Sequence, residues 1–420
     1  MKITLPEFEA SLGEVTFPIA VATSGGADSL ALLLLTHRWA QQKKGRVIGL
    51  TVDHGLRIES KKEALFVQKW AYKEGIEHIT LKWEGEKPTS RLQEKAREAR
   101  YQCLINWCKN NHISTLLLGH HQQDQEETFW LRLSSGSGLD GLSGMKKKSF
   151  REGIVLLRPL LKFPKERLKA TLLAENHIWI EDPSNQNPRF FRGRLRSFLE
   201  KEGLSQIRLF NIMEKLQVDV DFIRNSLQHI IKTSVQLCEG GYLTLQKKSF
   251  EELHPALAKR LIPLLMHWFS DMNYSSRATQ VTTILGKLKL SFPFTAGGIY
   301  WIPQSEKILL LREVSAIKEN FNLSHLHKET LWDQRFWIDP EIKKHVPPET
   351  YIAPLKAFPL LRKKGDSPIP SSVFPTLPAL WTKGEVVSIP HFCYNLTSEV
   401  DLQRFFYLKP FFHDSLRFTI

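Results

Sequence analysis

The chain has 420 residues, which is too long for one typical domain, and its 58 Lys and Arg residues outnumber the 44 Asp and Glu residues, giving a formal charge of +14. This charge favours a polyanionic partner such as nucleic acid. The four cysteines form no CxxC pair, which argues against structural zinc, an iron–sulfur cluster and a disulfide framework, and the apolar run Leu30–Leu35 is far shorter than a membrane span of roughly 20 residues; we expect a soluble cytoplasmic protein.

The first predicted strand, Ile19–Thr23, turns through two glycines into an apolar helix. Gly25 and Gly26 allow the backbone to approach an anion and to take positive φ, and the first free N–H groups of the helix point at that anion. Hydroxyl donors are added by Ser24 and Ser29. The loop Ser24-Gly25-Gly26-Ala27-Asp28-Ser29 therefore predicts a phosphate-binding site, with an ordinary chain reversal as the alternative.

Asp28 suggests a metal ion at this loop. An unshielded carboxylate about 4 Å from a phosphate charge would cost roughly 4 kcal/mol at an effective dielectric constant of about 20, and a Mg²⁺ ion between the two groups removes that cost. The alternative is that Asp28 only caps and charges the first helical turn. The loop does not read GxxxxGK[ST], so the lysine of a kinase-type P-loop is absent.

Further strands are predicted at Val47–Val52, His78–Trp83 and Thr115–Gly119, with helices between them. This alternation is typical of a doubly wound, Rossmann-like parallel sheet. Because ligands bind outside the carboxyl ends of such strands, we expect Asp53 and His54, and also His120-His121, to meet the Ser24–Ser29 loop in one crevice.

A literal GxGxxG pattern occurs at 136–141. It follows the helical run Glu126–Leu133 and not a strand, so we reject it as a dinucleotide fingerprint. We expect a mobile loop there, with Lys146-Lys147-Lys148 close behind it.

The distribution of apolar residues along the chain predicts one large domain followed by smaller ones. We place the nucleotide-binding domain at 1–203, a helical domain at 204–315, a polar connector at 316–350 and a small mixed α/β or mainly β domain at 351–420.

Seven motifs in series give the first 200 residues a resemblance to a known family. The motifs are Ser24–Ser29, Val52–Arg57, Gln93–Tyr101, Gly119–Thr128, Gly136–Met145, Arg158–Leu161 and Asp182–Asn185 with the arginines after it. The first of them resembles the SGGxDS signature of the PP-loop ATP pyrophosphatases, and with all seven the chain is similar to the bacterial tRNA(Ile)-lysidine synthetases. The C-terminal half matches only loosely, chiefly at Trp381–Val387.

The resemblance implies a ligase that uses ATP and Mg²⁺ to adenylate carbon-2 of the wobble cytidine in an isoleucine tRNA with a CAU anticodon. Free L-lysine then displaces AMP, which gives lysidine. Its ATP-binding residues would be Ser24–Ser29, Asp53, His54, Arg97 and Arg100, with Asp28 also on Mg²⁺. Its catalytic and lysine-binding residues would be Asp124, Glu127, Arg192 and His120, and the domains after residue 203 would bind the tRNA.

The side-chain chemistry of these residues is suited to the roles that the resemblance implies, but each residue also has a simpler structural interpretation. Arg97 and Arg100 lie three apart on one helical face and could clamp phosphate, or could be exposed surface arginines. Asp124 and Glu127 could bind the lysine ammonium and accept its proton, or could pair with a helix dipole. A buried structural role is an equal alternative for His121.

The chain departs from the family pattern at three positions. Gln123 stands where the family usually has an aspartate, and an amide cannot accept the amine proton and binds Mg²⁺ less well. Asn187 and Gly193 are two further departures beside Arg192. The alternatives are therefore another PP-loop tRNA-modifying enzyme, which lysine dependence would separate, and a catalytically inactive tRNA-binding homologue. The sequence leaves a monomer and a homodimer open.

Overall fold

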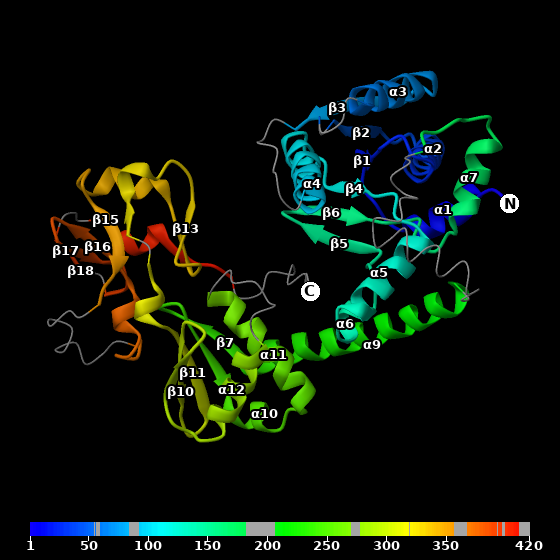
Figure 1. Ribbon diagram of the computed structural model, residues 1–420. Coiled ribbons are helices and arrows are strands. Elements are labelled where there is room, and N and C mark those ends of the chain that lie inside the picture. Colours follow the sequence, from blue (N-terminus) through cyan, green and yellow to red (C-terminus); the bar gives the residue numbers. More distant parts are fainter. Residues whose placement is uncertain are drawn as a thin grey trace. The chain divides into compact units, whose positions relative to one another are not determined.

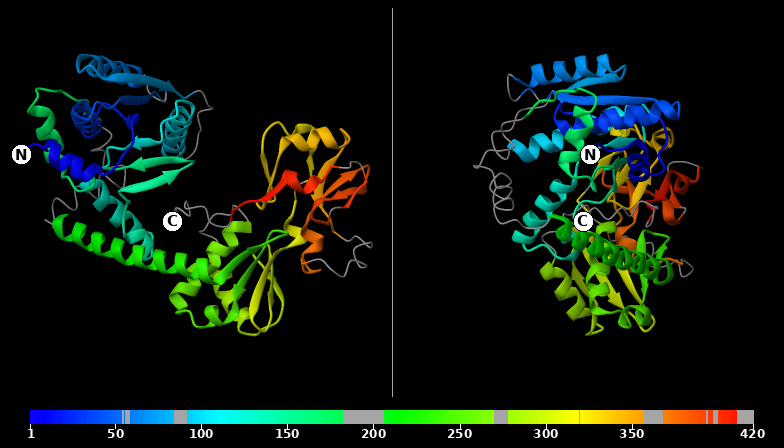
Figure 2. Two further views of the ribbon diagram at one scale, coloured as in Figure 1. Left: turned by 180° about the vertical axis from the view of Figure 1, so that it is seen from behind. Right: turned by 90° about the vertical axis from the view of Figure 1, so that its right-hand side faces the viewer.

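The computed structural model describes residues 1–53, 55, 59–83, 92–181, 206–269, 278–318, 320–356, 368–392, 394–396 and 400–410 (Figures 1 and 2). The chain divides into two compact units, Met1–Val220 and Asp221–Leu416, and each is described by itself. Among the helices that the structure describes, none combines the length and apolar composition that a membrane crossing requires.

The first unit is built on a six-stranded sheet with the order β3-β2-β1-β4-β6-β5. All neighbouring strands are parallel except β5 and β6, which form an antiparallel hairpin at one edge. The strands are β1 (Ile19–Ala22), β2 (Val47–Asp53), β3 (Glu77–Lys82), β4 (Thr115–Leu117), β5 (Lys148–Arg151) and β6 (Ile154–Leu157). The four predicted strands and the Rossmann-like sheet are confirmed; the edge hairpin was not predicted.

Helices cover both faces of this sheet because successive strand residues point to opposite sides. In β1, Ile19 and Val21 join a core with α1, α2, α3 and α7, whereas Ala20 joins a second core with α4. The helices are α1 (Leu5–Leu12), α2 (Ala27–Gln42), α3 (Glu59–Lys73), α4 (Leu92–Asn110), α5 (Gln122–Ser134), α6 (Leu139–Leu142) and α7 (Lys165–Leu173).

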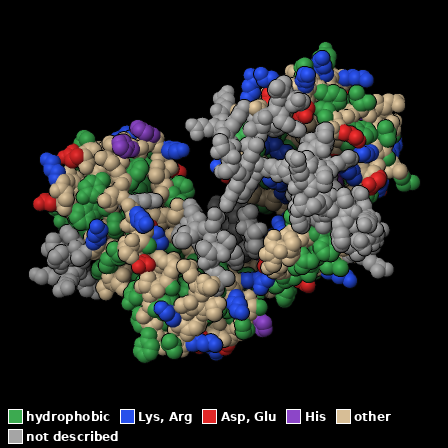
Figure 3. Space-filling view, viewed as in Figure 1, with side chains coloured by type: hydrophobic (Ala, Val, Ile, Leu, Met, Phe, Trp, Pro, Cys, Tyr) green, Lys and Arg blue, Asp and Glu red, His purple; other side chains and the backbone are tan. Residues whose placement is uncertain are grey.

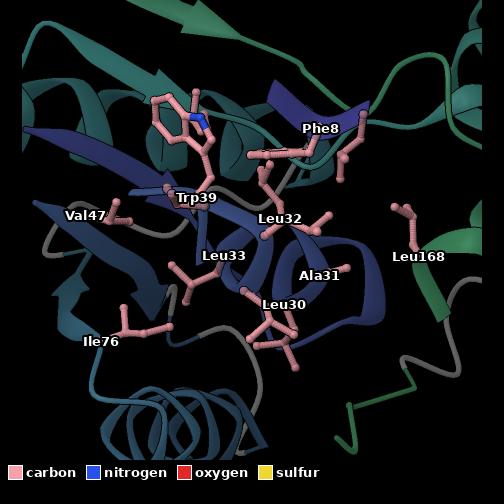
Figure 4. Close-up of a cluster of buried hydrophobic side chains, with 14 of the residues drawn as sticks. Phe8, Leu30, Ala31, Leu32, Leu33, Trp39, Val47, Ile76 and Leu168 are labelled. Atoms are coloured by element: carbon pink, nitrogen blue, oxygen red, sulfur yellow. The ribbon is translucent and has the colours of Figure 1, made fainter. Parts of the chain in front are cut away.

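Helix α2 is buried on nearly all sides. Leu30, Leu32 and Leu33 are fully buried, and Figure 4 shows their side chains among Phe8, Val47 and Leu168. An apolar helix of this kind belongs inside a core. The loop before α2 therefore leads directly into a helix that is anchored in the core.

In the second unit, the first sheet is five-stranded and antiparallel, with the order β7-β8-β11-β10-β9. The long helix α9 (Gln206–Ser234) leads into it, and α11 and α12 share its core. Region 204–315 thus contains a sheet as well as the expected helices. Its other elements are β7 (Val235–Cys238), β8 (Tyr242–Gln246), α10 (Lys247–Glu251), α11 (Pro255–Phe269), α12 (Ala278–Leu288), β9 (Phe294–Ala296), β10 (Ile299–Pro303) and β11 (Lys307–Arg312).

Two further sheets follow, with the orders β12-β15-β16-β17-β18 and β13-β14-β19. Residues 316–350, expected as a connector, contribute β12, β13 and β14, because their apolar residues Trp332, Phe336 and Ile338 pack into a shared core. The strands are β12 (Phe321–Asn322), β13 (Thr330–Trp332), β14 (Phe336–Ile338), β15 (Tyr351–Pro354), β16 (Pro378–Thr382), β17 (Glu385–Ile389), β18 (Tyr394–Asn395) and β19 (Phe406–Leu408). Short 3₁₀ helices between them are η3 (Val314–Ala316), η4 (Leu323–His325), η5 (Pro340–His345), η7 (Phe374–Thr376), η8 (Pro390–Phe392) and η9 (Leu402–Phe405).

Arg335 joins the sheets of the second unit. Its guanidinium is fully buried and donates to Asp333 Oδ2 (2.7 Å), Gly241 O (3.1 Å) and Thr376 O (2.7 Å). Arg312 donates to the other oxygen of Asp333 at 2.9 Å. A charge this deep is tolerable only because each polar group has a partner.

We expect His391 to make the second unit sensitive to acid. Burial, together with the charge of Arg335, lowers the pKa of His391 from 6.5 to about 4. Because the folded pKa lies below the unfolded one, the stability is complete above about pH 6.5 and falls by about 3 kcal/mol as the pH drops toward 4. Hydrogen exchange of the β14 and β16 amides, measured at pH 7 and at pH 4.5, should show that His391→Gln loses less protection at the lower pH than the wild-type protein does. Equal losses in the variant and the wild type would contradict this prediction.

Candidate active site

A cavity of about 680 Å³ opens in the first unit beyond the carboxyl ends of β1, β2 and β4. Figure 3 shows basic side chains inside a hollow on this face of the unit. Eight of the predicted site residues line the cavity: Ser24, Gly26, Asp28, Ser29, Arg97, Arg100, His120 and Asp124. The sequence signals from separate strands thus converge on one site.

The loop before α2 is closed by its own hydroxyl. Ser29 Oγ donates to Gly26 O and accepts from Ser24 N, each at 3.0 Å. This hydroxyl therefore holds the loop's shape, whereas the sequence predicted it as a donor to the ligand. Gly25 has φ of 87°, whereas Gly26, the extended N-cap residue of α2, has φ of −74°, so only the first of the two glycines adopts the positive φ that both allow.

A segment after α7 packs against this loop. Ile180 N donates to Gly25 O at 2.9 Å, and the Ile180 side chain lines the cavity. Gly119, which follows β4, also approaches closely: a Cβ there would lie 3.3 Å from the backbone of Asp28 and Ser29. The loop is thus held from three directions, by α2, by Gly119 and by Ile180.

The carboxylate of Asp28 faces two basic groups. Its Oδ2 lies 3.3 Å from His121 Nε2 and 3.8 Å from Lys165 Nζ. Burial alone would lower the pKa of His121, but the hydrogen bond to Asp28 and the charges of Asp124 and Asp28 raise it above its ordinary value. His121 is 2% exposed, and it links the α2 loop to the start of α5.

Guanidinium groups gather on another wall of the cavity, around the Tyr101 ring. Arg97 Cζ lies 5.4 Å and Arg100 Cζ 5.9 Å from the ring centroid, and Arg158 at the end of β6 contributes to the same positive field. Burial, followed by the charges of Arg158, Arg97 and Arg100, lowers the pKa of His120 well below 6.5. His120 is therefore neutral at physiological pH, and the arginines supply the positive charge.

The candidate lysine-binding carboxylates differ in position. Asp124 lines the cavity, and its Oδ2 accepts a hydrogen bond from His121 N at 3.0 Å, as a helix-capping residue does. Glu127 is 2% exposed and is not among the residues that line the cavity. Sequence reasoning also missed its neighbour Glu126, whose pKa burial and the charge of Glu127 raise to about 7.

The remaining predicted residues lie off the cavity wall or outside the described part of the chain. Asp53 ends β2, and its Oδ1 accepts from Ser60 Oγ (2.6 Å) and Gly55 N (3.0 Å), so it closes the turn after the strand. Gly25 and Ala27 belong to the loop but not to the cavity lining. His54, Arg192 and the Asp182–Asn185 segment lie outside the described residues.

Gln123, the departure from the family pattern, joins α5 to α7. Its Oε1 accepts from Lys165 N at 3.0 Å, and its Nε2 donates to Glu166 Oε2 at 3.3 Å. An aspartate could make the first of these bonds but not the second. This amide therefore has a structural role at the start of α7.

The segment after α5 is held by side chains, contrary to the mobile loop that we expected. Gln125 pairs with both backbone groups of Met145, at 2.6 and 2.7 Å, and Arg132 Nη1 donates to Gly141 O (2.7 Å) and Gly144 O (3.1 Å). Part of the GxGxxG segment forms the short helix α6. These bonds satisfy backbone groups that an open loop would leave to water.

The donor set fits a magnesium ion that arrives with phosphates. Within the described ranges, no group of three or more His, Cys, Asp and Glu side chains could hold a metal ion by itself. Asp28 lies in a loop of the kind that binds phosphate, and 26% of its side chain is accessible, so its carboxylate can reach a bound ion. Mg²⁺ is commonly bound in this way, by one or two carboxylates together with substrate phosphates.

Known proteins resemble both the first unit and nearly the whole chain. The PP-loop domain family matches residues 6–202. The tRNA(Ile)-lysidine synthase of Wolbachia pipientis wMel is 34% identical over 392 residues, which is 90% of this chain and 89% of that protein. The protein of the same name from Ruegeria pomeroyi is 31% identical over 89% of this chain and 88% of its own length. Among solved structures, the U34-tRNA thiolase NcsA from Methanococcus maripaludis matches 50% of this chain and 77% of its own, at 19% identity and a TM-score of 0.43.

We expect Gly25→Ala to destabilise the first unit and Gly26→Ala to leave it nearly unchanged. A Cβ at Gly25 would lie 2.9 Å from Ile180 Cδ1 and 3.1 Å from Val67 Cγ2, and its φ of +87° is unfavourable for alanine. The nearest atoms at Gly26 are 3.9 Å and 4.0 Å away. The backbone term alone is roughly 1–2 kcal/mol, measurable by urea unfolding. Equal losses in the two variants would show that the Gly25 conformation is unimportant.

Proposed function

Because this chain belongs to the tRNA(Ile)-lysidine synthase family, we propose that it joins L-lysine to carbon-2 of the wobble cytidine in an isoleucine tRNA with a CAU anticodon. ATP is cleaved to AMP and pyrophosphate through an adenylated cytidine. The observation that carries the proposal is a single cavity in which a phosphate-type loop, an arginine pair and the Asp124 carboxylate meet. The loop and the arginines can bind the phosphates of ATP for adenylation, and the carboxylate can bind the lysine amine and accept its proton.

In the first step, the cytidine oxygen at carbon-2 forms a bond to the α-phosphorus of ATP, and the bond from that phosphorus to the β-phosphate oxygen breaks. The N–H groups at the start of α2 hold phosphate oxygens, and Arg97 and Arg100 offer forked donors to them. Asp28 would hold a Mg²⁺ ion brought by ATP, whose charge stabilises the leaving pyrophosphate. Neutral His120 can exchange a hydrogen bond with the nucleotide without adding charge.

In the second step, the lysine amine attacks carbon-2 and AMP leaves with the oxygen. Free lysine has an amine pKa near 10.4, so it binds as a cation and has to lose a proton before it attacks. Asp124 lines the cavity and can hold the ammonium and accept that proton. Glu127 and Arg192 are the further candidates for the amine and for the lysine carboxylate.

The tRNA has to present an unstacked wobble base to this cavity. The charge of +14 supports binding of the anticodon stem through phosphates, with strong salt dependence. We assign this binding to the regions 204–315 and 351–420, and we place the reaction in the cytoplasm.

Labelled lysine should be incorporated into unmodified isoleucine tRNA with ATP and Mg²⁺, and Asp28→Asn should lower the rate by about 100-fold or more, because the neutral amide is a poor Mg²⁺ ligand. Asp221→Asn is the control, because Asp221 is an exposed aspartate that pairs with Arg224. Binding of tRNA by the wild-type chain without lysine incorporation or pyrophosphate release would overturn the ligase proposal. Pyrophosphate release without lysine dependence would indicate a different PP-loop enzyme.

Asp124→Asn should raise the KM for lysine about tenfold or more and leave tRNA-dependent pyrophosphate release nearly intact. The amide keeps an oxygen to accept from His121 N but loses the charge that attracts the ammonium. Glu127→Gln is the matched comparison, since it neutralises a carboxylate off the cavity wall. If neither variant changes the KM for lysine, the assignment of these carboxylates to lysine is wrong.

A further inference from the structure

Lys165 lies beside the Ser24–Ser29 loop, and none of the sequence motifs pointed to it. It is the first residue of α7, and its Nζ lies 3.8 Å from Asp28 Oδ2. About a third of its side chain (31%) remains accessible. The site therefore has a basic side chain next to the one carboxylate of the loop.

The position of Lys165 is poor for helix stability. The start of a helix is its positive end, where an added cation is unfavourable. Neighbouring lysines are different: Lys162 pairs with Glu214 and Lys169 pairs with Glu181 at the protein surface. Lys165 points instead toward the loop that binds phosphate.

Gln123 fixes the backbone of Lys165. The amide oxygen accepts Lys165 N–H at 3.0 Å, and Gln122 N donates to Phe163 O at 3.1 Å, so the starts of α5 and α7 are tied together. The flexible stem of the lysine is then the part that can move. An ammonium on such a stem can turn from a carboxylate to a phosphate a few ångströms away.

We propose that Lys165 is a pyrophosphate-binding residue, which leaves Asp28 and contacts the β- and γ-phosphates when ATP binds. The inference rests on the proposed function, because it assumes that ATP occupies the cavity. A Mg²⁺ ion held by Asp28 repels the ammonium, and the phosphate oxygens attract it. Lys165 thereby supplies from α7 the charge that the loop itself lacks, since the loop contains no GK[ST] lysine.

The affinities for ATP and AMP, measured by titration calorimetry with Mg²⁺, test this directly, because AMP lacks the two phosphates concerned. Lys165→Met should weaken ATP binding by about tenfold or more and leave AMP binding unchanged. Lys165→Arg should restore most of the loss, and Lys162→Met is the control with an unrelated ion pair. Lys165→Gln replaces the methionine variant if the latter does not fold.

The outcomes separate this inference from the proposed function. An unchanged ATP affinity in Lys165→Met, or an equal fall for ATP and AMP, would overturn the role of Lys165 while leaving the ligase proposal standing. A wild-type chain that binds neither nucleotide would overturn the proposed function itself. Gln123→Leu should lower the ratio of ATP to AMP affinity in the same direction as Lys165→Met, and an unchanged ratio would remove Gln123 as the positioning residue.

Discussion

The burial of α2 is the constraint on which the site depends. A helix that is apolar over most of its surface has to be covered on most sides, and α1, α3, α7 and the sheet share its core. The N-terminus of α2 is therefore held at the carboxyl edge of the sheet. Gly119 and Ile180 then fit against a loop whose position is already determined. Core packing thus positions the start of α2, and the Ser29 hydroxyl closes the loop before it.

Charge in the cavity is distributed over two walls. On one, Arg97 and Arg100 flank the Tyr101 ring, and burial together with the charges of Arg158, Arg97 and Arg100 lowers the pKa of His120 well below its ordinary value. On the other, Asp28 and Asp124 raise the pKa of His121. The first arrangement suits a polyphosphate, and the second suits cations such as a metal ion or an ammonium. Because the positive and negative side chains lie on separate walls, one cavity can bind an anionic ligand and a cationic ligand at the same time.

Local patterns were sufficient to predict the sheet and the loop. Alternating apolar runs identified β1 to β4, and Ser24–Ser29, His120 and Asp124 follow strand ends, so the topology itself brings them together. Lys165 and Ile180 could not be found in this way, because packing and not chain order brings them near Asp28 and Gly25. The burial of Glu127 was also hidden, since helical spacing places it beside Asp124 without saying what covers it. Gly26 shows the same limit: a glycine permits positive φ but does not require it.

Arg335 has a consequence for how the second half of the chain can be divided. Its guanidinium binds Gly241 O in the β7–β8 turn, Thr376 O in η7 and the carboxylate of Asp333 in the β13–β14 turn, so connections next to three sheets share one buried charge network. Loss of any one of these partners would leave part of the buried guanidinium unsatisfied, which is strongly destabilising. For this reason we expect the three sheets to unfold together. Truncated proteins that end between Arg335 and Thr376 would keep the guanidinium and lose its partner in η7, and not only the last strands.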